Sequence, residues 1–270
     1  MRPRLVIVGF GNLGQAIVRG AVLSGIAAPS EIGAIDANAA RLAEAAEMGL
    51  RTGDEVSVAE AEVVVLAVKP QVFAEAAAAI APIGRDGPLV ASVMAGVRSQ
   101  AIRAALGGSA RVVRTMPNTP AAIRRGITAI AADAEVAAED LARVEQLFAS
   151  VGRTVRVPEA HFDAVTASSG SGPGFVYRFL EAWIYAGEQA GLDPDTARAL
   201  ARHTLIGAAA LLEETGETAE VLRAKVTSKG GTTAAGVARL DDASARAGGI
   251  DTLMIETLRA ARDRGAELGA

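Results

Sequence analysis

Short runs of consecutive apolar residues alternate with alanine-rich stretches through the first part of the chain. Six runs rich in β-branched side chains predict strands at residues 5–8, 32–35, 63–68, 89–93, 111–114 and 127–131. Strands that are apolar on both faces and separated by helices are typical of a parallel sheet covered on both sides. The pattern therefore predicts an α/β fold with a doubly wound parallel sheet.

The strand pattern stops near Arg156, and alanine- and leucine-rich segments continue from there to the C-terminus. Asp193 before Pro194 combines an N-cap with a proline at the first helical position, which predicts a helix from there to about Leu212. A further helix is expected over residues 250–268. We therefore predict an α/β domain over residues 1–158 and an all-α domain over residues 159–270.

The composition of the chain argues against nucleic acid and membranes as binding partners. The 27 basic and 31 acidic residues are scattered, and the net charge is −4, so no basic surface for nucleic acid or an anionic membrane is indicated. No uncharged apolar stretch approaches the ~18 residues that span a bilayer. The chain has no cysteine, which excludes thiolate chemistry. We expect a soluble, cytoplasmic protein that acts on a small molecule without a metal.

The motif Gly9-Phe10-Gly11-Asn12-Leu13-Gly14 follows the first predicted strand and opens the first predicted helix. In this position, the glycines allow a tight turn, close approach of a pyrophosphate and packing of the helix, whose N-terminus attracts phosphate. A plain glycine turn is the alternative. Because the motif lies in a βαβ context, it predicts a dinucleotide site.

Asp36 ends the second predicted strand, where an acidic side chain can accept hydrogen bonds from the adenosine ribose. Such an acid repels a 2′-phosphate and favours NADH, whereas Arg41 on the following helix partly offsets that charge and leaves NADPH open. The alternative is that Asp36 only caps this helix.

Two further strand ends are expected at the same edge of the sheet, where ligands collect in open α/β folds. One carries Ala67-Val68-Lys69-Pro70 and the other Ala95-Gly96. Lys69 is a candidate cation beside the dinucleotide, or else a solvated charge. A third strand end carries Pro117-Asn118, a rigid polar loop that forms either a substrate wall or a structural turn.

The segment Thr227-Ser228-Lys229-Gly230-Gly231-Thr232-Thr233 places hydroxyls around two glycines before a predicted helix. Flexible backbone at a helix N-terminus can form a nest of N–H groups that binds a carboxylate. An ordinary capped helix start is the alternative, but four hydroxyls exceed what capping requires.

Taken together, these segments resemble the pyrroline-5-carboxylate reductase family over essentially the whole chain. Five motifs in order carry the resemblance, at residues 9–14, 67–71, 114–120, 170–173 and 226–233. The resemblance implies an N-terminal Rossmann domain, a C-terminal helical dimerisation domain, NADPH or NADH as hydride donor, and reduction of 1-pyrroline-5-carboxylate to L-proline. It also implies a homodimer, or an assembly of dimers, whose active site is shared between subunits.

The resemblance also implies roles for single residues. The segments 9–14, 67–70 and 95–96 would hold the dinucleotide, while Ser228, Gly231 and Thr232 would bind the substrate carboxylate. Thr233 would hydrogen-bond the imine nitrogen. Leu13, Gly174-Phe175 and Thr218-Ala219 depart from the family's usual residues without removing a named role. Asp36 and Asp54 are less usual near the adenosine pocket, which puts the family's use of NADPH in doubt for this chain.

Two other functions fit parts of the pattern. A β-hydroxyacid dehydrogenase on a similar plan needs a lysine or histidine to handle an alcohol proton, and Lys69 is the best candidate. A dinucleotide sensor that kept the fold is the non-enzymatic alternative. The complete glycine nest with Thr233 favours the imine reductase over both.

Overall fold

The computed structural model describes residues 4–133, 135–244 and 248–268. The chain divides into two compact units. Unit 1 comprises Met1–Ser171 with Ala261–Ala270, and unit 2 comprises Gly172–Ala260. The predicted domain boundary at residues 158–159 lies earlier in the chain than the boundary between these units, and it stays a prediction.

Unit 1 is built on an eight-stranded sheet whose strand order is β3-β2-β1-β4-β5-β6-β7-β8. The pairs from β3 to β6 are parallel, β7 runs antiparallel to β6, and β8 is parallel to β7. The strands are β1 (Leu5–Val8), β2 (Ile32–Ile35), β3 (Arg51–Thr52), β4 (Val63–Leu66), β5 (Leu89–Ser92), β6 (Val112–Met116), β7 (Gly126–Ala132) and β8 (Gly152–Arg156). The predicted α/β class with a parallel-dominated sheet is confirmed.

The expectation of six strands was wrong at both edges of the sheet. β3 has only two residues, and β8 carries Arg153 and Arg156, so neither edge strand shows the apolar run that marks a buried strand. The sheet departs from the predicted parallel arrangement at β7, which runs antiparallel to β6. A short turn of 3₁₀ helix at Thr119–Ile123 joins β6 to β7 without a crossover helix, which is the connection that antiparallel neighbours allow.

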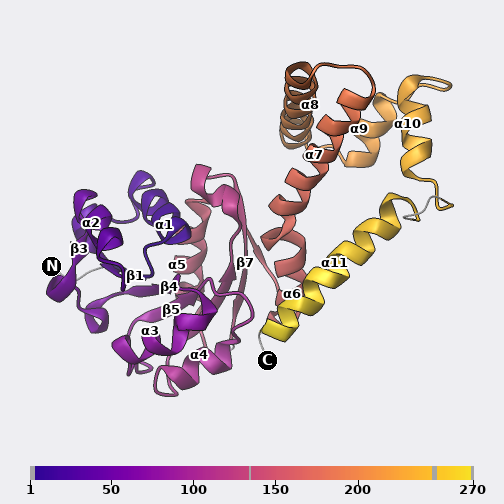
Figure 1. Ribbon diagram of the computed structural model, residues 1–270. Helices are drawn as coiled ribbons and strands as arrows, with labels where there is room; N and C mark the ends of the chain where they lie inside the picture. Colours follow the sequence, from indigo (N-terminus) through magenta and orange to yellow (C-terminus); the bar gives the residue numbers. More distant parts are fainter. Residues whose placement is uncertain (1–3, 134, 245–247, 269–270) are drawn as a thin grey trace. The chain divides into compact units, whose positions relative to one another are not determined.

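Side chains on the central strands alternate between two apolar layers. In β1, for example, Leu5 and Ile7 face one layer while Val6 and Val8 face the other. The first layer is covered by α1 (Asn12–Leu23), α2 (Ala39–Glu47) and α5 (Ala138–Ala149), and the second by α3 (Phe73–Ile80) and α4 (Ser99–Ala105). Figure 1 shows α1 and α2 on the opposite side of the sheet from α3 and α4. This sandwich brings the C-terminal ends of β1, β2 and β4 to one edge.

Unit 2 is helical. Its helices are α7 (Gly172–Gln189), α8 (Pro194–Thr215), α9 (Ala219–Lys225) and α10 (Thr232–Leu240), and α11 (Gly249–Leu268) begins in it and ends in unit 1. The Asp193 side chain accepts a hydrogen bond from the Thr196 backbone N–H at 3.1 Å, as the predicted N-cap requires. Within the described residues, no helix is long and apolar enough to cross a membrane.

Unit 2 has almost no interior of its own. Among its described residues, only Ala197 and Ala201 are buried. Large apolar side chains stand in solvent instead, including Phe179 and Trp183, whose rings contact each other with centroids 5.8 Å apart. Exposed apolar area on this scale marks an interaction surface.

Candidate functional site

The glycine motif forms the turn between β1 and α1. Gly9 has a φ of 99°, and a Cβ at this position would lie 2.6 Å from the Ala67 carbonyl oxygen. A Cβ on Gly14 would lie 2.2 Å from the Gly9 carbonyl oxygen, so both positions require glycine. Gly11 is the N-cap of α1 and supplies no side-chain cap, which leaves the first N–H groups of the helix open to an anion.

A cavity of about 680 Å³ lies beside this turn. Its lining brings together three chain segments that the sequence predicted to meet: the glycine turn, the end of β2, and the end of β4. The lining residues include Gly9, Gly11, Asp36, Ala67, Val68 and Lys69, together with Ala37, Asn38 and Arg41. Its volume and its position at the C-terminal strand ends fit a dinucleotide.

Asp36 has a role that sequence reasoning missed. One carboxylate oxygen accepts from the Phe10 N–H at 2.7 Å, and the other accepts from the Asn38 N–H at 2.8 Å. The carboxylate therefore ties the glycine turn to the end of β2. The N-cap of α2 is Asn38, whose side chain accepts from the Ala40 N–H, so Asp36 is not that cap.

The other residues predicted to hold the dinucleotide are not part of the lining of this cavity. Phe10 is fully buried in the core, Leu13 packs against that core, and Gly14 is buried, so they shape the turn. Asn12 is the first residue of α1, and Pro70 begins a turn of 3₁₀ helix after β4. Ala95 and Gly96 follow β5, and Gly96 lines a second cavity that also measures about 680 Å³.

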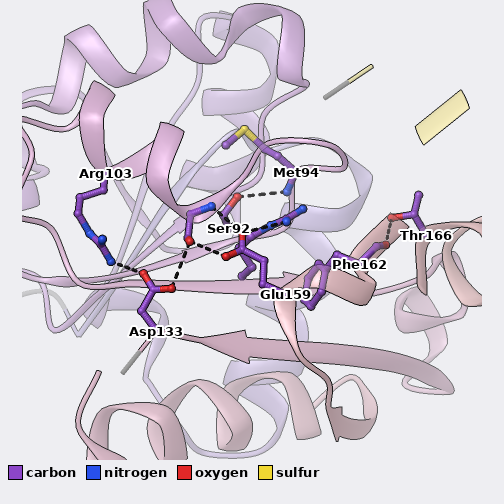
Figure 2. A network of polar contacts seen from close by, with 9 residues as sticks. Ser92, Met94, Arg103, Asp133, Glu159, Phe162 and Thr166 are labelled. Atoms are coloured by element: carbon purple, nitrogen blue, oxygen red, sulfur yellow. Dashed lines mark hydrogen bonds and ion pairs between the residues drawn. The ribbon is translucent and has the colours of Figure 1, made fainter. Parts of the chain in front are cut away.

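The second cavity is polar and contains an ordered network (Figure 2). Glu159 accepts hydrogen bonds from the Ser99 hydroxyl at 2.7 Å, the Ser99 N–H at 2.8 Å and Arg114 at 3.0 Å. The Arg114 side chain is 5% exposed, and its guanidinium lies 4.5 Å from the centroid of the Phe162 ring. Asp133 extends the network by pairing with Arg103. The network fastens α4 and β6 to the segment after β8.

The pKa of Glu159 lies below its ordinary value. Burial on its own raises the pKa, but the hydrogen bonds from Ser99 and the Arg114 guanidinium favour the charged form and outweigh it. Removing the charge would leave Arg114 buried without its counter-ion.

We expect Glu159→Gln to lower the free energy of unfolding by about 1–2 kcal/mol at pH 7, because a charged hydrogen-bonded pair is lost. A carboxylate with a depressed pKa stabilises the fold above its unfolded value, near 4.3, and this contribution disappears as pH falls through the folded value. Urea unfolding at several pH values should therefore show the two proteins converging below about pH 4. Glu60→Gln, at an exposed position, is the control; an equal loss in both variants would contradict the role of the network.

Pro117 and Asn118 follow β6 but line neither of these two cavities. Pro117 is buried, and the Asn118 side-chain oxygen accepts from the Ile127 N–H at 3.0 Å. That bond holds the 3₁₀ turn against β7. The contacts within the chain are those of the structural turn, and a role in substrate binding stays a prediction.

The segment before α10 has an open helix start. Gly231 is the N-cap and makes no side-chain cap, and Gly230 has a φ of 73°. Ser228, Thr232 and Thr233 are exposed, whereas the Thr227 hydroxyl donates to the Arg223 carbonyl at the end of α9. The Ser228 hydroxyl oxygen lies 2.4 Å from where a Cβ on Gly231 would be, so the serine lies over the glycine. Because the N-cap is a glycine, no side chain at that position caps α10, and anion binding by this segment stays a prediction.

Neither histidine lies in either cavity: His161 ends a 3₁₀ turn and His203 lies within α8. In the part of the chain that the structure describes, no three His, Asp or Glu side chains are grouped so as to hold a metal ion. Sheet topology, glycine turn and cavity together define a dinucleotide-binding α/β protein with an appended helical unit.

Comparison with known proteins identifies the family to which this dinucleotide-binding chain is similar. The model of a family described as pyrroline-5-carboxylate reductase dimerisation matches residues 159–268, and one described as NADP oxidoreductase, coenzyme F420-dependent, matches residues 4–96. The pyrroline-5-carboxylate reductase of Synechocystis is 40% identical over 272 residues, covering 100% of this chain and 99% of the relative. That of Pseudomonas aeruginosa is 38% identical, covering 98% and 97%.

Solved structures agree with these relatives. The structure of a pyrroline-5-carboxylate reductase from Coxiella burnetii superposes with a TM-score of 0.91 at 32% identity, covering 100% of both chains. The chain belongs to the pyrroline-5-carboxylate reductase family. The resemblance read from the five motifs is confirmed.

Proposed function

We propose that the protein is a pyrroline-5-carboxylate reductase that uses NADPH or NADH to reduce 1-pyrroline-5-carboxylate to L-proline, the last step of proline biosynthesis. The observation that carries the proposal is the identity of about 40% to a reductase of that name over the entire chain. The dinucleotide-sized cavity at the glycine turn supports it independently.

The chain fits a nicotinamide dinucleotide at the first cavity. The glycine turn and the open N-terminus of α1 would hold the pyrophosphate, and Asp36 at the end of β2 would accept a hydrogen bond from the adenosine ribose. Lys69 lies in the wall at the end of β4. When bound, the reduced nicotinamide supplies a hydride. The chain's own task is to hold the substrate and keep its nitrogen oriented.

The segment around Gly230 and Gly231 is proposed to hold the substrate. Ser228, Gly231 and Thr232 bind the carboxylate, and Thr233 hydrogen-bonds the imine nitrogen. A cyclic imine is basic enough to bind protonated, so its carbon accepts hydride and its nitrogen already carries the amine proton. No separate acid is required, and orientation alone can lower a barrier by ~7–11 kcal/mol. This accounts for a site built from hydroxyls and backbone.

Unit 2 is proposed to form a homodimer with a second copy of the chain. Unit 2 has about ninety residues and buries too little apolar surface to offset the conformational entropy lost on folding. A second copy of the chain would cover its exposed aromatic and aliphatic side chains. The family model matched over residues 159–268 is one of dimerisation. We also propose that the enzyme works in the cytoplasm, where reduced nicotinamide cofactors are regenerated, on a small molecule and without nucleic acid.

A substrate comparison tests the proposed function against the β-hydroxyacid alternative. Oxidation of NADH and of NADPH would be followed in parallel with 1-pyrroline-5-carboxylate as substrate. Reduction of NAD⁺ and of NADP⁺ would be followed with a β-hydroxyacid as substrate. Turnover confined to the imine is expected. Turnover confined to the hydroxyacid would replace the proposal, with Lys69 as the proton-handling group.

Asp36→Ser should shift the ratio of kcat/KM for the two cofactors toward NADPH, because the carboxylate repels a 2′-phosphate. Steady-state kinetics with both cofactors measures the ratio. Asp54→Ser removes a charge that does not line the cavity and should leave it unchanged. An unaltered ratio for Asp36→Ser would mean that the carboxylate only fixes the turn.

A further inference from the structure

Arg41 lies in the wall of the dinucleotide cavity, near the position proposed for the adenosine ribose. It occupies the first turn of α2, close in sequence to Asp36 and Asn38, which line the same cavity. A guanidinium in this place is suited to a 2′-phosphate, because its planar fork of donors matches phosphate oxygens. By position alone, Arg41 would favour NADPH.

The structure shows Arg41 held by another group. Its Nη1 lies 2.8 Å from Oε2 of Glu44, and the Gln15 side-chain amide donates to the same oxygen at 2.6 Å. Gln15 also donates to the Phe10 carbonyl in the glycine turn at 3.3 Å. Glu44 thus joins α2 to the start of α1 and draws the guanidinium to itself.

Charge at this wall favours a ribose without phosphate. The hydrogen bond from Arg41, with further help from Gln15, keeps the pKa of Glu44 below its ordinary value, so Glu44 is ionised at neutral pH. Asp36 adds a second carboxylate, and both of its oxygens are fixed by backbone N–H groups. The cavity lining carries two carboxylates, Asp36 and Glu75, and two cations, Arg41 and Lys69, and Glu44 beside Arg41 adds one further negative charge behind the wall.

We propose that Glu44 is a specificity-determining residue, which directs the cavity toward NADH by holding Arg41 in an ion pair. The proposal rests on the proposed dinucleotide function of this cavity. Glu44 does not itself line the cavity, so it acts through Arg41 as a positioning residue. With Glu44 neutral, Arg41 is released to a 2′-phosphate.

Dissociation constants measured by cofactor fluorescence test this without relying on turnover. For Glu44→Gln, the dissociation constant for NADPH should fall about two- to five-fold while that for NADH changes less than about two-fold, since the exposed ion pair that competes with the phosphate for the guanidinium is removed. The gain should shrink at high salt, because it comes from partly exposed charges.

Three variants isolate the cause. Glu47→Gln removes the same charge from the same helix outside the cavity lining and should leave both constants unchanged. Arg41→Ala added to Glu44→Gln should cancel the gain for NADPH. Arg41→Ala alone should weaken NADPH binding by less than about five-fold, because Glu44 already holds that guanidinium and only its screened charge is lost.

An unchanged NADPH constant in Glu44→Gln, with the thermal melt of the wild type, would overturn the inference and leave the proposed function standing. A loss of NADPH affinity of five-fold or more in Arg41→Ala alone would also overturn it, since Arg41 would already serve the phosphate. Failure of the wild type to bind either dinucleotide would overturn both the inference and the proposed function.

Discussion

Trp183→Glu should produce a protein that elutes as a monomer and has lost much of its helical signal. Trp183 and Phe179 form an exposed aromatic pair on α7, in a unit whose described residues include only two buried alanines. If a second copy covers this surface, truncating the buried tryptophan lowers the stability of the interface by about 3–5 kcal/mol. In a two-fold symmetric dimer this loss occurs twice, once in each subunit. A glutamate adds the cost of an unpaired buried charge.

Light scattering after gel filtration would report the mass, and far-ultraviolet circular dichroism would report the helix content. Leu23→Glu is the matched control, because Leu23 is a large exposed apolar residue on α1 in unit 1 and should tolerate the charge. If Trp183→Glu stayed a dimer with full helix content, the aromatic pair would lie outside the subunit interface. Loss of the dimer in the Leu23 control would show that the assay does not separate the two surfaces.

Thr233→Ala should lower kcat/KM for 1-pyrroline-5-carboxylate by about ten- to a hundred-fold while dinucleotide binding stays intact. One hydrogen bond to a charged nitrogen at the reacting centre corresponds to about 1.5–3 kcal/mol. Thr233 is exposed in the first turn of α10 and caps nothing there, so the fold should tolerate alanine. Steady-state kinetics would measure turnover, and fluorescence titration would measure cofactor binding.

Thr227→Ala is the control within the same segment, because the Thr227 hydroxyl donates to the Arg223 carbonyl and is not proposed to touch substrate. Its kcat/KM should stay within about two-fold of wild type. Full activity in Thr233→Ala, combined with loss of activity in Lys69→Gln, would contradict the imine site and favour an alcohol-handling lysine.

The central fold was predictable because its determinants are local. The buried strands β1, β2, β4 and β5 are continuous apolar runs, and the glycine turn follows the first of them. β8 was not predictable by the same reasoning, since its arginines give it no apolar run and its pairing with β7 is set by tertiary contacts. The antiparallel direction of β7 depends on the 3₁₀ turn after β6, whose conformation two prolines alone do not fix.

The sequence predicted which chain segments meet at the site, but it did not predict the individual hydrogen bonds between them. Sequence placed the glycine turn, Asp36 and Lys69 at one edge of the sheet, and they share a cavity. It missed that Asp36 accepts from Phe10 N–H, because that bond joins residues 26 positions apart. It also missed Glu159, whose partners Ser99 and Arg114 come from α4 and β6. An acidic residue close to the end of the last strand was the only available sign.

Identification of the product tests the proposed activity directly. The purified protein, incubated with 1-pyrroline-5-carboxylate and NADH or NADPH, should form L-proline in a 1:1 ratio to the reduced cofactor consumed, as measured by chiral chromatography and absorbance together. This stoichiometry is expected with at least one of the two cofactors. Cofactor oxidation without proline, or no oxidation with either cofactor, would contradict it.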